Sequence, residues 1–175
     1  MNKFNAPFAL VVKKGTFEKY EQINESQQNY ELSREKAINL IIDNGLNATT
    51  EIAEGLEIIS TENVNVGSLA KNNEDGFISL NSALFKEVIA IRVTQKYKHR
   101  NLNIFFNAQL EEEVLECPRI YMEIEDGVDI VLNELHSPGG SDILKIPVIE
   151  IIVKENARVS HNRILVGSPN EKNFT

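Results

Sequence analysis

From about residue 50 onward, short apolar runs separated by polar breaks dominate the sequence, and this texture constrains the fold more than any other feature. The runs are rich in Ile and Val, and the breaks between them contain Gly, Asn, Asp or Pro, which is the pattern of β-strands joined by tight connections. The sequence therefore predicts a mainly β protein with strands within residues 56–59, 88–93, 102–106, 119–124, 128–135, 146–153 and 157–165.

A five-residue pattern recurs at three of the breaks, in residues 54–58 (EGLEI), 126–130 (DGVDI) and 155–159 (ENARV). Each copy has an acidic residue, then Gly or Asn, then a small or apolar residue, a charged residue and an aliphatic one. Gly and Asn tolerate positive φ best, so the second residue of each copy is predicted to adopt the left-handed conformation at a sharp corner. Because side chains alternate along a strand, the charged fourth residue is expected to point outward and the aliphatic fifth inward.

Recurring corners of this kind indicate a stacked architecture, in which each coil of a β-solenoid pairs with its neighbours. On this pattern alone, a β-solenoid stands beside an antiparallel β-sandwich, used for binding, or a barrel, because those folds also contain many short strands. Pairing of residues 119–124 with residues 148–153 distinguishes the solenoid from the sandwich, since it is parallel in a solenoid.

The first part of the chain, residues 1–76, is predicted to be an N-terminal α/β appendage that leads into the core of residues 77–175. Residues 7–12 are interpreted as a buried strand. A helix is expected from Ser33, a good N-cap, to Gly45, a good C-terminal cap, with an apolar stripe at helical spacing. That stripe consists of Ala37, Ile38, Ile41 and Ile42. One or two further helical turns are expected to begin near Ser79.

The balance of charge argues against a nucleic-acid partner. The net charge is −8, and the basic run at residues 96–100 is short, whereas phosphate binding needs clustered Lys and Arg. No apolar run approaches the roughly 20 residues of a membrane-spanning helix. The first residues have a brief apolar stretch followed by lysines, unlike a secretory signal. We therefore expect neither nucleic acid nor membrane as a partner.

The sequence offers little for metal binding or catalysis. Cys117 is the only cysteine, which excludes an internal disulfide and fits a reducing compartment. Cys117 and His161 are weak candidate metal ligands. For Cys117, the preferred interpretation is a small buried residue at the start of a strand. For His161, it is a histidine held by hydrogen bonds on the face of Ala157 and Val159. The histidines lack metal-ligand spacing; they are His99, His136 and His161.

We expect no catalytic residue. His136 lies near Ser137 and Asp142 in "LHSPGGSD", but the chain contains no G-x-S-x-G elbow and this segment lacks the G-K-[ST] ending of a phosphate loop. The alternative function is a β-helical carbohydrate lyase or hydrolase, which gathers acidic and basic residues on one face of the solenoid. The residues available for such a group are Arg119, Asp126 and Asp129.

Three sequence blocks between about Phe77 and Leu165 resemble the SufB/SufD family of iron–sulfur cluster assembly proteins, and SufD most closely. They are "ISLNSALFKEVIAIRV", "CPRIYMEIEDGVDIVLNEL" and "IPVIEIIVKENARVSHNRIL", and their order and spacing agree with the family pattern. His161 matches the family's histidine after the Glu-Asn-Ala corner. The next residues, from Asn162 to Leu165, differ from the aromatic residue and the closing Gln that are common in the family.

The resemblance implies that residues 77–175 form the first rungs of a SufBD-type right-handed parallel β-helix, and this fold agrees with the recurring corners. It implies a scaffold subunit without catalytic turnover that binds a SufB-like protein and a SufC-like ATPase of the ABC type. An iron–sulfur cluster would belong to the assembled complex, with no cofactor bound by this chain itself. The expected location is the cytoplasm, with a plastid as the alternative, and pairing through exposed strand edges would allow a homodimer.

Overall fold

The computed structural model describes residues 37–43, 45–49, 52–71, 75–107, 114–136, 143–165 and 172–173. All of them belong to one compact unit, Glu35–Thr175. The expected strand at residues 7–12 and the expected N-cap at Ser33 lie outside the described residues. The division of the chain at residues 76 and 77 stays a prediction.

Within the described residues the protein is mainly β, as the sequence predicts, with parallel strands in mixed sheets, little helix and no closed barrel. The strands form three sheets. Neighbouring strands across the first sheet are, in order, β11 (Arg158–Leu165), β8 (Asp129–His136), β5 (Asn101–Asn107), β1 (Ala37–Asp43) and β2 (Leu46–Asn47). The order in the second sheet is β10 (Val148–Val153), β7 (Arg119–Ile124), β4 (Val88–Val93) and β3 (Leu56–Ile58), and in the third it is β12 (Lys172–Asn173), β9 (Ile143–Lys145) and β6 (Val114–Glu116).

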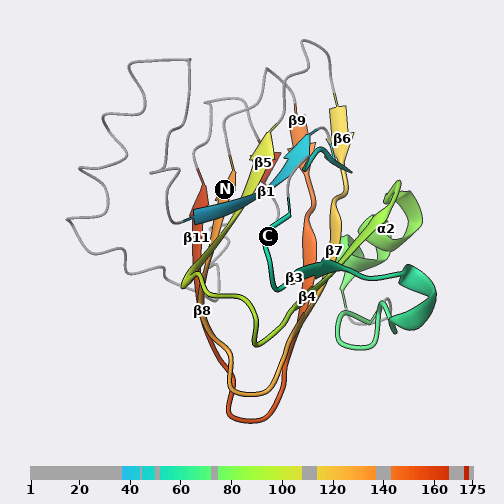
Figure 1. Ribbon diagram of the computed structural model, residues 1–175. Coiled ribbons are helices and arrows are strands. Elements are labelled where there is room, and N and C mark those ends of the chain that lie inside the picture. Colours follow the sequence, from blue (N-terminus) through green and yellow to red (C-terminus); the bar gives the residue numbers. More distant parts are fainter. Residues whose placement is uncertain are drawn as a thin grey trace, which may run out of the picture. The chain divides into compact units, whose positions relative to one another are not determined.

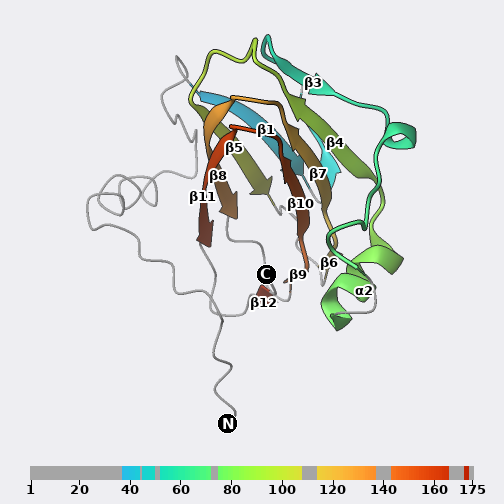
Figure 2. The ribbon, with the colours of Figure 1, turned by 90° about the horizontal axis from the view of Figure 1, so that it is seen from below.

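The two larger sheets are built on parallel strands in register. In the second sheet, Arg119 of β7 lies between Val88 of β4 and Val148 of β10. The first sheet repeats this arrangement with β5, β8 and β11. The connections from β4 to β5, from β7 to β8 and from β10 to β11 are nested (Figures 1 and 2). Parallel pairing of residues 119–124 with residues 148–153 is thereby confirmed, and an antiparallel sandwich of these strands is wrong.

The corners have the predicted backbone conformation. Gly55, Gly127 and Asn156 have φ of 85°, 73° and 56°. Two of the corners are hydrogen-bonded to each other, because the Glu155 backbone N–H donates to Asp126 Oδ1 at 3.0 Å and the Gly127 N–H donates to the Glu155 carbonyl at 3.0 Å. The corner at Gly55 differs, since β3 runs antiparallel to β4. The expectation that all three corners join parallel stacked strands is therefore wrong for residues 54–58.

The helix expected up to Gly45 is also wrong over its described part, because residues 37–43 form strand β1. All seven residues pair in parallel with β5, and Leu40 and Ile42, two residues apart, are each only 1% exposed. A short apolar run fits a buried strand as well as a helix, and in this chain pairing with a distant strand decides between them.

Helical structure occurs instead at η1 (Thr61–Asn63) and α2 (Gly76–Leu84). Helix α2 begins three residues before the expected Ser79, because Asp75 caps it. Asp75 Oδ1 accepts from the backbone N–H groups of Phe77 and Ile78 at 2.6 and 3.1 Å. Among the described residues, no helix is long and apolar enough to cross a membrane.

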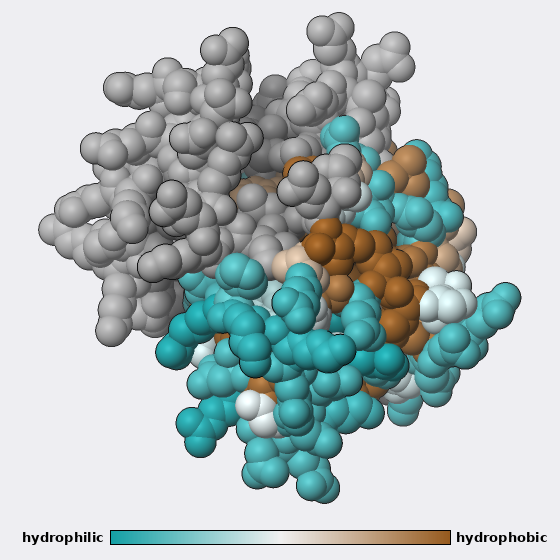
Figure 3. Space-filling model, in the orientation of Figure 1, coloured by the Kyte–Doolittle hydropathy of each residue, from teal (hydrophilic) through white to brown (hydrophobic). Residues whose placement is uncertain are grey.

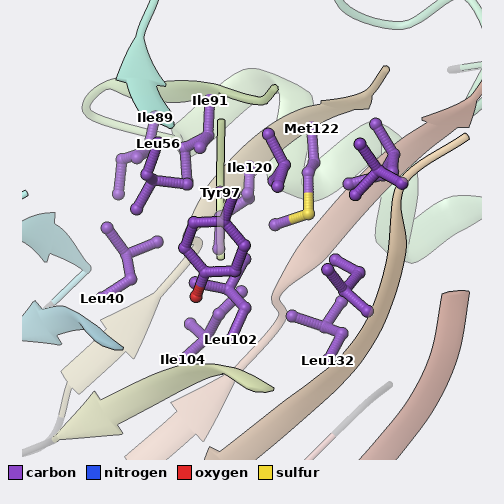
Figure 4. Close-up of a cluster of buried hydrophobic side chains, with 14 of the residues drawn as sticks. Leu40, Leu56, Ile89, Ile91, Tyr97, Leu102, Ile104, Ile120, Met122 and Leu132 are labelled. Carbon is purple, nitrogen blue, oxygen red and sulfur yellow. The ribbon is translucent and has the colours of Figure 1, made fainter. Parts of the chain in front are cut away.

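The hydrophobic core lies between the two larger sheets (Figure 4). Leu102, Ile104, Met122 and Leu132 are fully buried. Tyr97, from the connection after β4, enters the same cluster, and its hydroxyl donates to the Asn101 carbonyl at 2.8 Å. Burial raises the pKa of Tyr97 to about 12. The core thus fixes the position of β8 and, through it, that of its neighbour β11.

Candidate functional site

A cluster of ionisable side chains lies at the end of the first sheet where β11 is the outermost strand. We name it the Glu134 cluster; its members are Glu134, His136, His161 and Arg163. The alternation of β8 places Glu134 on the core-facing side with Leu132, and Glu134 is fully buried. Glu134 Oε1 lies 2.7 Å from His136 Nε2, and Oε2 lies 2.8 Å from His161 Nε2 and 2.9 Å from Arg163 Nε.

Glu134 remains ionised in this environment. Burial by itself raises the pKa of a carboxyl group, but the hydrogen bonds from His136 and His161 and the charge of Arg163 outweigh it. The pKa of Glu134 is therefore lowered. A buried carboxylate with three nitrogen partners joins β8 to β11 more specifically than apolar contact does.

His136 completes the buried side of the cluster. Its ring stacks on Phe106, with a centroid distance of 4.4 Å and nearly parallel planes. Because Glu134 is ionised, His136 Nε2 carries the proton that it shares with the carboxylate. His136 Nδ1 is buried without a hydrogen-bond partner among the described residues, an arrangement that costs about 1–3 kcal/mol. Phe106 and Glu134 therefore hold the ring within the described part of the chain.

An asparagine ladder crosses three strands of the same sheet. The Asn133 side-chain amide donates to Asn103 Oδ1 at 2.8 Å, and the Asn162 amide donates to Asn133 Oδ1 at 2.9 Å. The register places Asn39 of β1 beside Asn103. Stacked amides of this kind are known from in-register parallel sheets. Each step uses one donor and one acceptor, so the oxygen of Asn162 faces away from β8.

A second buried polar group ties the second sheet to its surroundings. Arg119 and Glu150, each 1% exposed, form an ion pair of 2.6 Å. Glu150 also accepts from the backbone N–H groups of Gly67, Leu69 and Ala70 at 2.7, 3.0 and 3.3 Å. Burial raises the pKa of Glu150, but these N–H donors and Arg119 outweigh it, so the pKa is lowered. The pair fixes the segment before α2 against β7 and β10.

Asn81 of α2 extends this group. It is fully buried and its amide donates to the carbonyls of Pro118 and Ile146 at 2.9 and 2.6 Å. Its oxygen lies 3.3 Å from a guanidinium nitrogen of Arg119. The network joins α2 to β7, to β10 and to the residues that precede these strands, and it therefore holds these parts of the fold together.

The residues singled out from the sequence are dispersed. Cys117 is buried just before β7, and burial together with Glu116 raises the pKa of its thiol, which keeps it neutral. His161 lies on the face of Val159, as expected, and its bond to Glu134 fits the structural interpretation. His99 packs edge-on against Tyr97. In the described part of the chain, no three His, Cys, Asp or Glu residues are arranged to hold a metal ion.

The residues considered for a carbohydrate-active site do not meet. Arg119 begins β7 and is held by Glu150. Asp126 lies in the corner beyond the other end of β7, where it accepts from Glu155, and Asp129 is exposed at the start of β8. No observation therefore favours a sugar-cleaving site at these positions.

Sequence reasoning missed Glu134, Arg163 and the asparagine ladder, although a signal for them was present. When the corners at 126–130 and 155–159 are aligned, Asn133 falls beside Asn162 and Glu134 beside Arg163. The alignment predicts these contacts without any structure. Its use requires the assumption that the two strands pair in parallel.

Searches of protein-family models, of curated proteins and of solved structures found no significant match to this chain.

Proposed function

We propose that the described strands are consecutive turns of a right-handed parallel β-helix and that the protein is a SufD-like scaffold subunit of an iron–sulfur cluster assembly complex. It acts by binding other proteins rather than by catalysis. One observation carries the proposal: β4, β7 and β10 pair in parallel and in register, and β5, β8 and β11 do the same. Register partners on these neighbouring strands lie 29 to 31 residues apart, which is one turn of such a coil.

A scaffold role needs a surface for partners, and the β10–β11 edge has the properties of one. β10 and β11 stand at the end of their sheets in the described strand order and are joined by one corner. An edge strand presents unpaired backbone N–H and C=O groups to any strand that approaches it. Val153 and Leu165 on these strands are 44% and 46% exposed. Addition of a partner strand would satisfy the backbone groups and cover both side chains.

The partners in this proposal follow from the resemblance. A SufB-like protein pairs with the β-helix, and a SufC-like ATPase completes the complex in which a cluster is built. The setting is the cytoplasm or a plastid, and no cofactor is resident in this chain.

Co-purification tests the proposal. The tagged full chain is mixed with purified SufB-like and SufC-like proteins from the same source, and we expect the three to elute together. Val153→Lys on β10 should weaken retention about tenfold by placing a charge on the contact surface. Ile58→Lys on β3 is the matched control, since Ile58 is 49% exposed at the opposite end of the same sheet. Failure of the unmodified chain to bind either protein would remove the proposal.

Cross-linking tests the stacked turns themselves. Val131 and Ser160 are register partners on β8 and β11. Cysteines at both positions, in a Cys117→Ser background, should form a disulfide readily because adjacent strands are about 5 Å apart. Val131→Cys combined with Arg158→Cys is the control, since a shift of two residues exceeds the reach of a disulfide. Equal cross-linking of both pairs would contradict the parallel register.

A further inference from the structure

Opposite charges join three pairs of neighbouring parallel strands. An ion pair of 2.9 Å joins β4 to β7, one of 2.6 Å joins β7 to β10, and one of 2.9 Å joins β8 to β11. The pairs are Arg92 with Glu123, Arg119 with Glu150, and Glu134 with Arg163. Each strand in these pairs is therefore matched to its neighbour by charge as well as by register.

Strand β11 presents only basic groups at the end of this series. It carries Arg158, His161 and Arg163 and no acidic residue, in a chain whose net charge is −8. On the β8 side, Asp129 lies beside Arg158 and Glu134 beside Arg163. The side chains of His161 and Arg163 are still 31% and 30% exposed, and Arg158 is exposed. A basic edge on an acidic protein favours an acidic partner.

The asparagine ladder adds a polar signal at the same edge. Asn162 is exposed, and its amide nitrogen is directed to Asn133, so its oxygen faces the open side. An asparagine in a neighbouring strand would donate to that oxygen and extend the ladder by one step. A strand matched to β11 therefore needs an asparagine at one position and a carboxylate at the next.

We propose that β11 binds an extended segment of a partner protein that contains an acidic residue, any three residues, asparagine and a second acidic residue. The segment lies parallel to β11, with its carboxylates at Arg158 and Arg163 and its asparagine at Asn162. Strand β8 has this pattern on the other side of β11: its residues Asp129, Asn133 and Glu134 are register partners of Arg158, Asn162 and Arg163. The inference rests on the proposed scaffold role and names the chemistry of the surface that the partner supplies.

A second copy of this chain fits the edge less well. Pairing β11 with β11 of another copy would bring two basic strands together, and like charges on neighbouring strands are destabilising. Head-to-tail addition would require a parallel edge at the other end, where antiparallel β2 and β3 are the outermost of the described strands. The charge pattern therefore selects a different, acidic segment as the occupant.

A peptide with the sequence of β8, DIVLNELH, between Gly-Ser flanks is the probe, and its binding to the full chain is followed by fluorescence anisotropy. We expect saturable binding that weakens with salt. Arg158→Glu should weaken it about tenfold, and a peptide with Lys in place of its Asp should recover most of the loss. Arg158 is exposed and outside the Glu134 cluster, so this variant keeps the fold. Lys96→Glu, at the exposed corner after β4, should leave binding unchanged.

The outcomes separate this inference from the proposed function. Absence of peptide binding, or binding that Arg158→Glu does not alter, would overturn the acidic-segment inference even if SufB-like and SufC-like proteins still co-purify. Loss of co-purification would remove the scaffold role itself. Sedimentation showing a dimer that the peptide fails to dissociate would assign the edge to a second copy and likewise overturn the inference.

Discussion

Corners with the same sequence pattern lie at both ends of the second sheet, and the strands that follow these corners differ in their direction relative to their neighbours. At one end, the corner at Gly55 leads into β3, which runs antiparallel to β4. At the other, the corner at Asn156 joins β10 to β11, and both strands run parallel to their neighbours. Both corner residues have positive φ. The pattern therefore determines the local turn, whereas the direction of the next strand depends on the edge that it meets.

The surface near α2 also differs from the β10–β11 edge. Figure 3 shows hydrophobic surface near the centre of the face drawn in Figure 1, next to the region where α2 lies. The exposed apolar residues of α2 include Phe77, Leu80 and Leu84. The β10–β11 edge combines exposed Val153 and Leu165 with basic and amide groups, and the Glu134 cluster lies beneath it. Substitutions in different parts of the molecule should therefore have effects of different size.

The largest effect is expected at the corner of β3. A Cβ on Gly55 would lie 2.1 Å from the Tyr97 backbone nitrogen, so Gly55→Ala combines a clash with the strain of positive φ. We expect a loss of about 3 kcal/mol or more in unfolding free energy. Gly127→Ala is the matched control, because nothing lies within 4 Å of its added Cβ, and it should cost about 1–2 kcal/mol. Urea denaturation measures both, and equal losses would contradict the close approach.

The next effect compares the middle of the sheet with its edge. Ile120 of β7 and Ile149 of β10 are register partners on the core side. Ile120 is fully buried, whereas Ile149 is only partly buried. Ile120→Ala should lower the unfolding free energy by about 3 kcal/mol and Ile149→Ala by about 1–2 kcal/mol. A larger loss at Ile149 would show that the edge is covered in solution.

Acid should weaken the protein through the two buried carboxylates. The pKa values of Glu134 and Glu150 are lowered in the folded protein from an ordinary value of 4.5. Below that value the unfolded chain binds more protons at these two carboxyl groups than the folded protein does. The stabilisation of the fold by the two carboxylates is therefore complete above pH 4.5 and is lost as the pH falls toward their pKa values in the folded protein. Each group contributes up to about 1.4 kcal/mol per pH unit to the slope of the unfolding free energy against pH.

Urea denaturation at several pH values below 4.5 tests this expectation. Glu134→Gln should reduce the slope of stability against pH, because one of the two titrating groups is removed. Asn162→Gln, a neutral substitution on the β10–β11 edge, should leave the slope unchanged. An unaltered slope in Glu134→Gln would mean that the pKa of Glu134 is not lowered in the folded protein.

Much of this fold could be predicted because the signals for strands and corners are local. The expected strands at 88–93 and 119–124 coincide with β4 and β7, since β-branched runs and breaking residues are neighbours in sequence. The left-handed residues at Gly127 and Asn156 follow from residue type alone. Strand β1 could not be predicted in the same way, because its apolar residues fit two periods and its partner β5 is distant in sequence.

The candidate site was harder to predict than the fold. Glu134 is an ordinary polar residue in the sequence, and its burial becomes evident only when β8 is placed between β5 and β11. Likewise, the antiparallel direction of β3 depends on which edge of β4 is open. Such features follow from pairing over long sequence separations, which single-strand patterns do not encode.

The asparagine ladder should contribute modestly and unequally. Asn133 takes part in two side-chain hydrogen bonds of the ladder and Asn162 in one. Because one such bond contributes about 0.5–1.5 kcal/mol, Asn133→Ala should cost about 1–2 kcal/mol and Asn162→Ala about half of that. Thermal unfolding measures both. If the occupant of β11 supplies a further asparagine, Asn162→Ala should weaken its binding more than it weakens the fold.

The smallest effect is expected at the corner between β10 and β11. Asn156 is exposed at a φ of 56°, and glycine adopts this conformation without strain but loses more entropy on folding. Asn156→Gly should therefore change the unfolding free energy by less than about 0.5 kcal/mol, whereas Asn156→Val should cost about 1–2 kcal/mol. Calorimetry resolves the two. A loss above about 1 kcal/mol for Asn156→Gly would mean that the asparagine side chain, and not only its backbone, holds this corner. The corners at Gly55 and Asn156 would then differ in chemistry as well as in the strands they join.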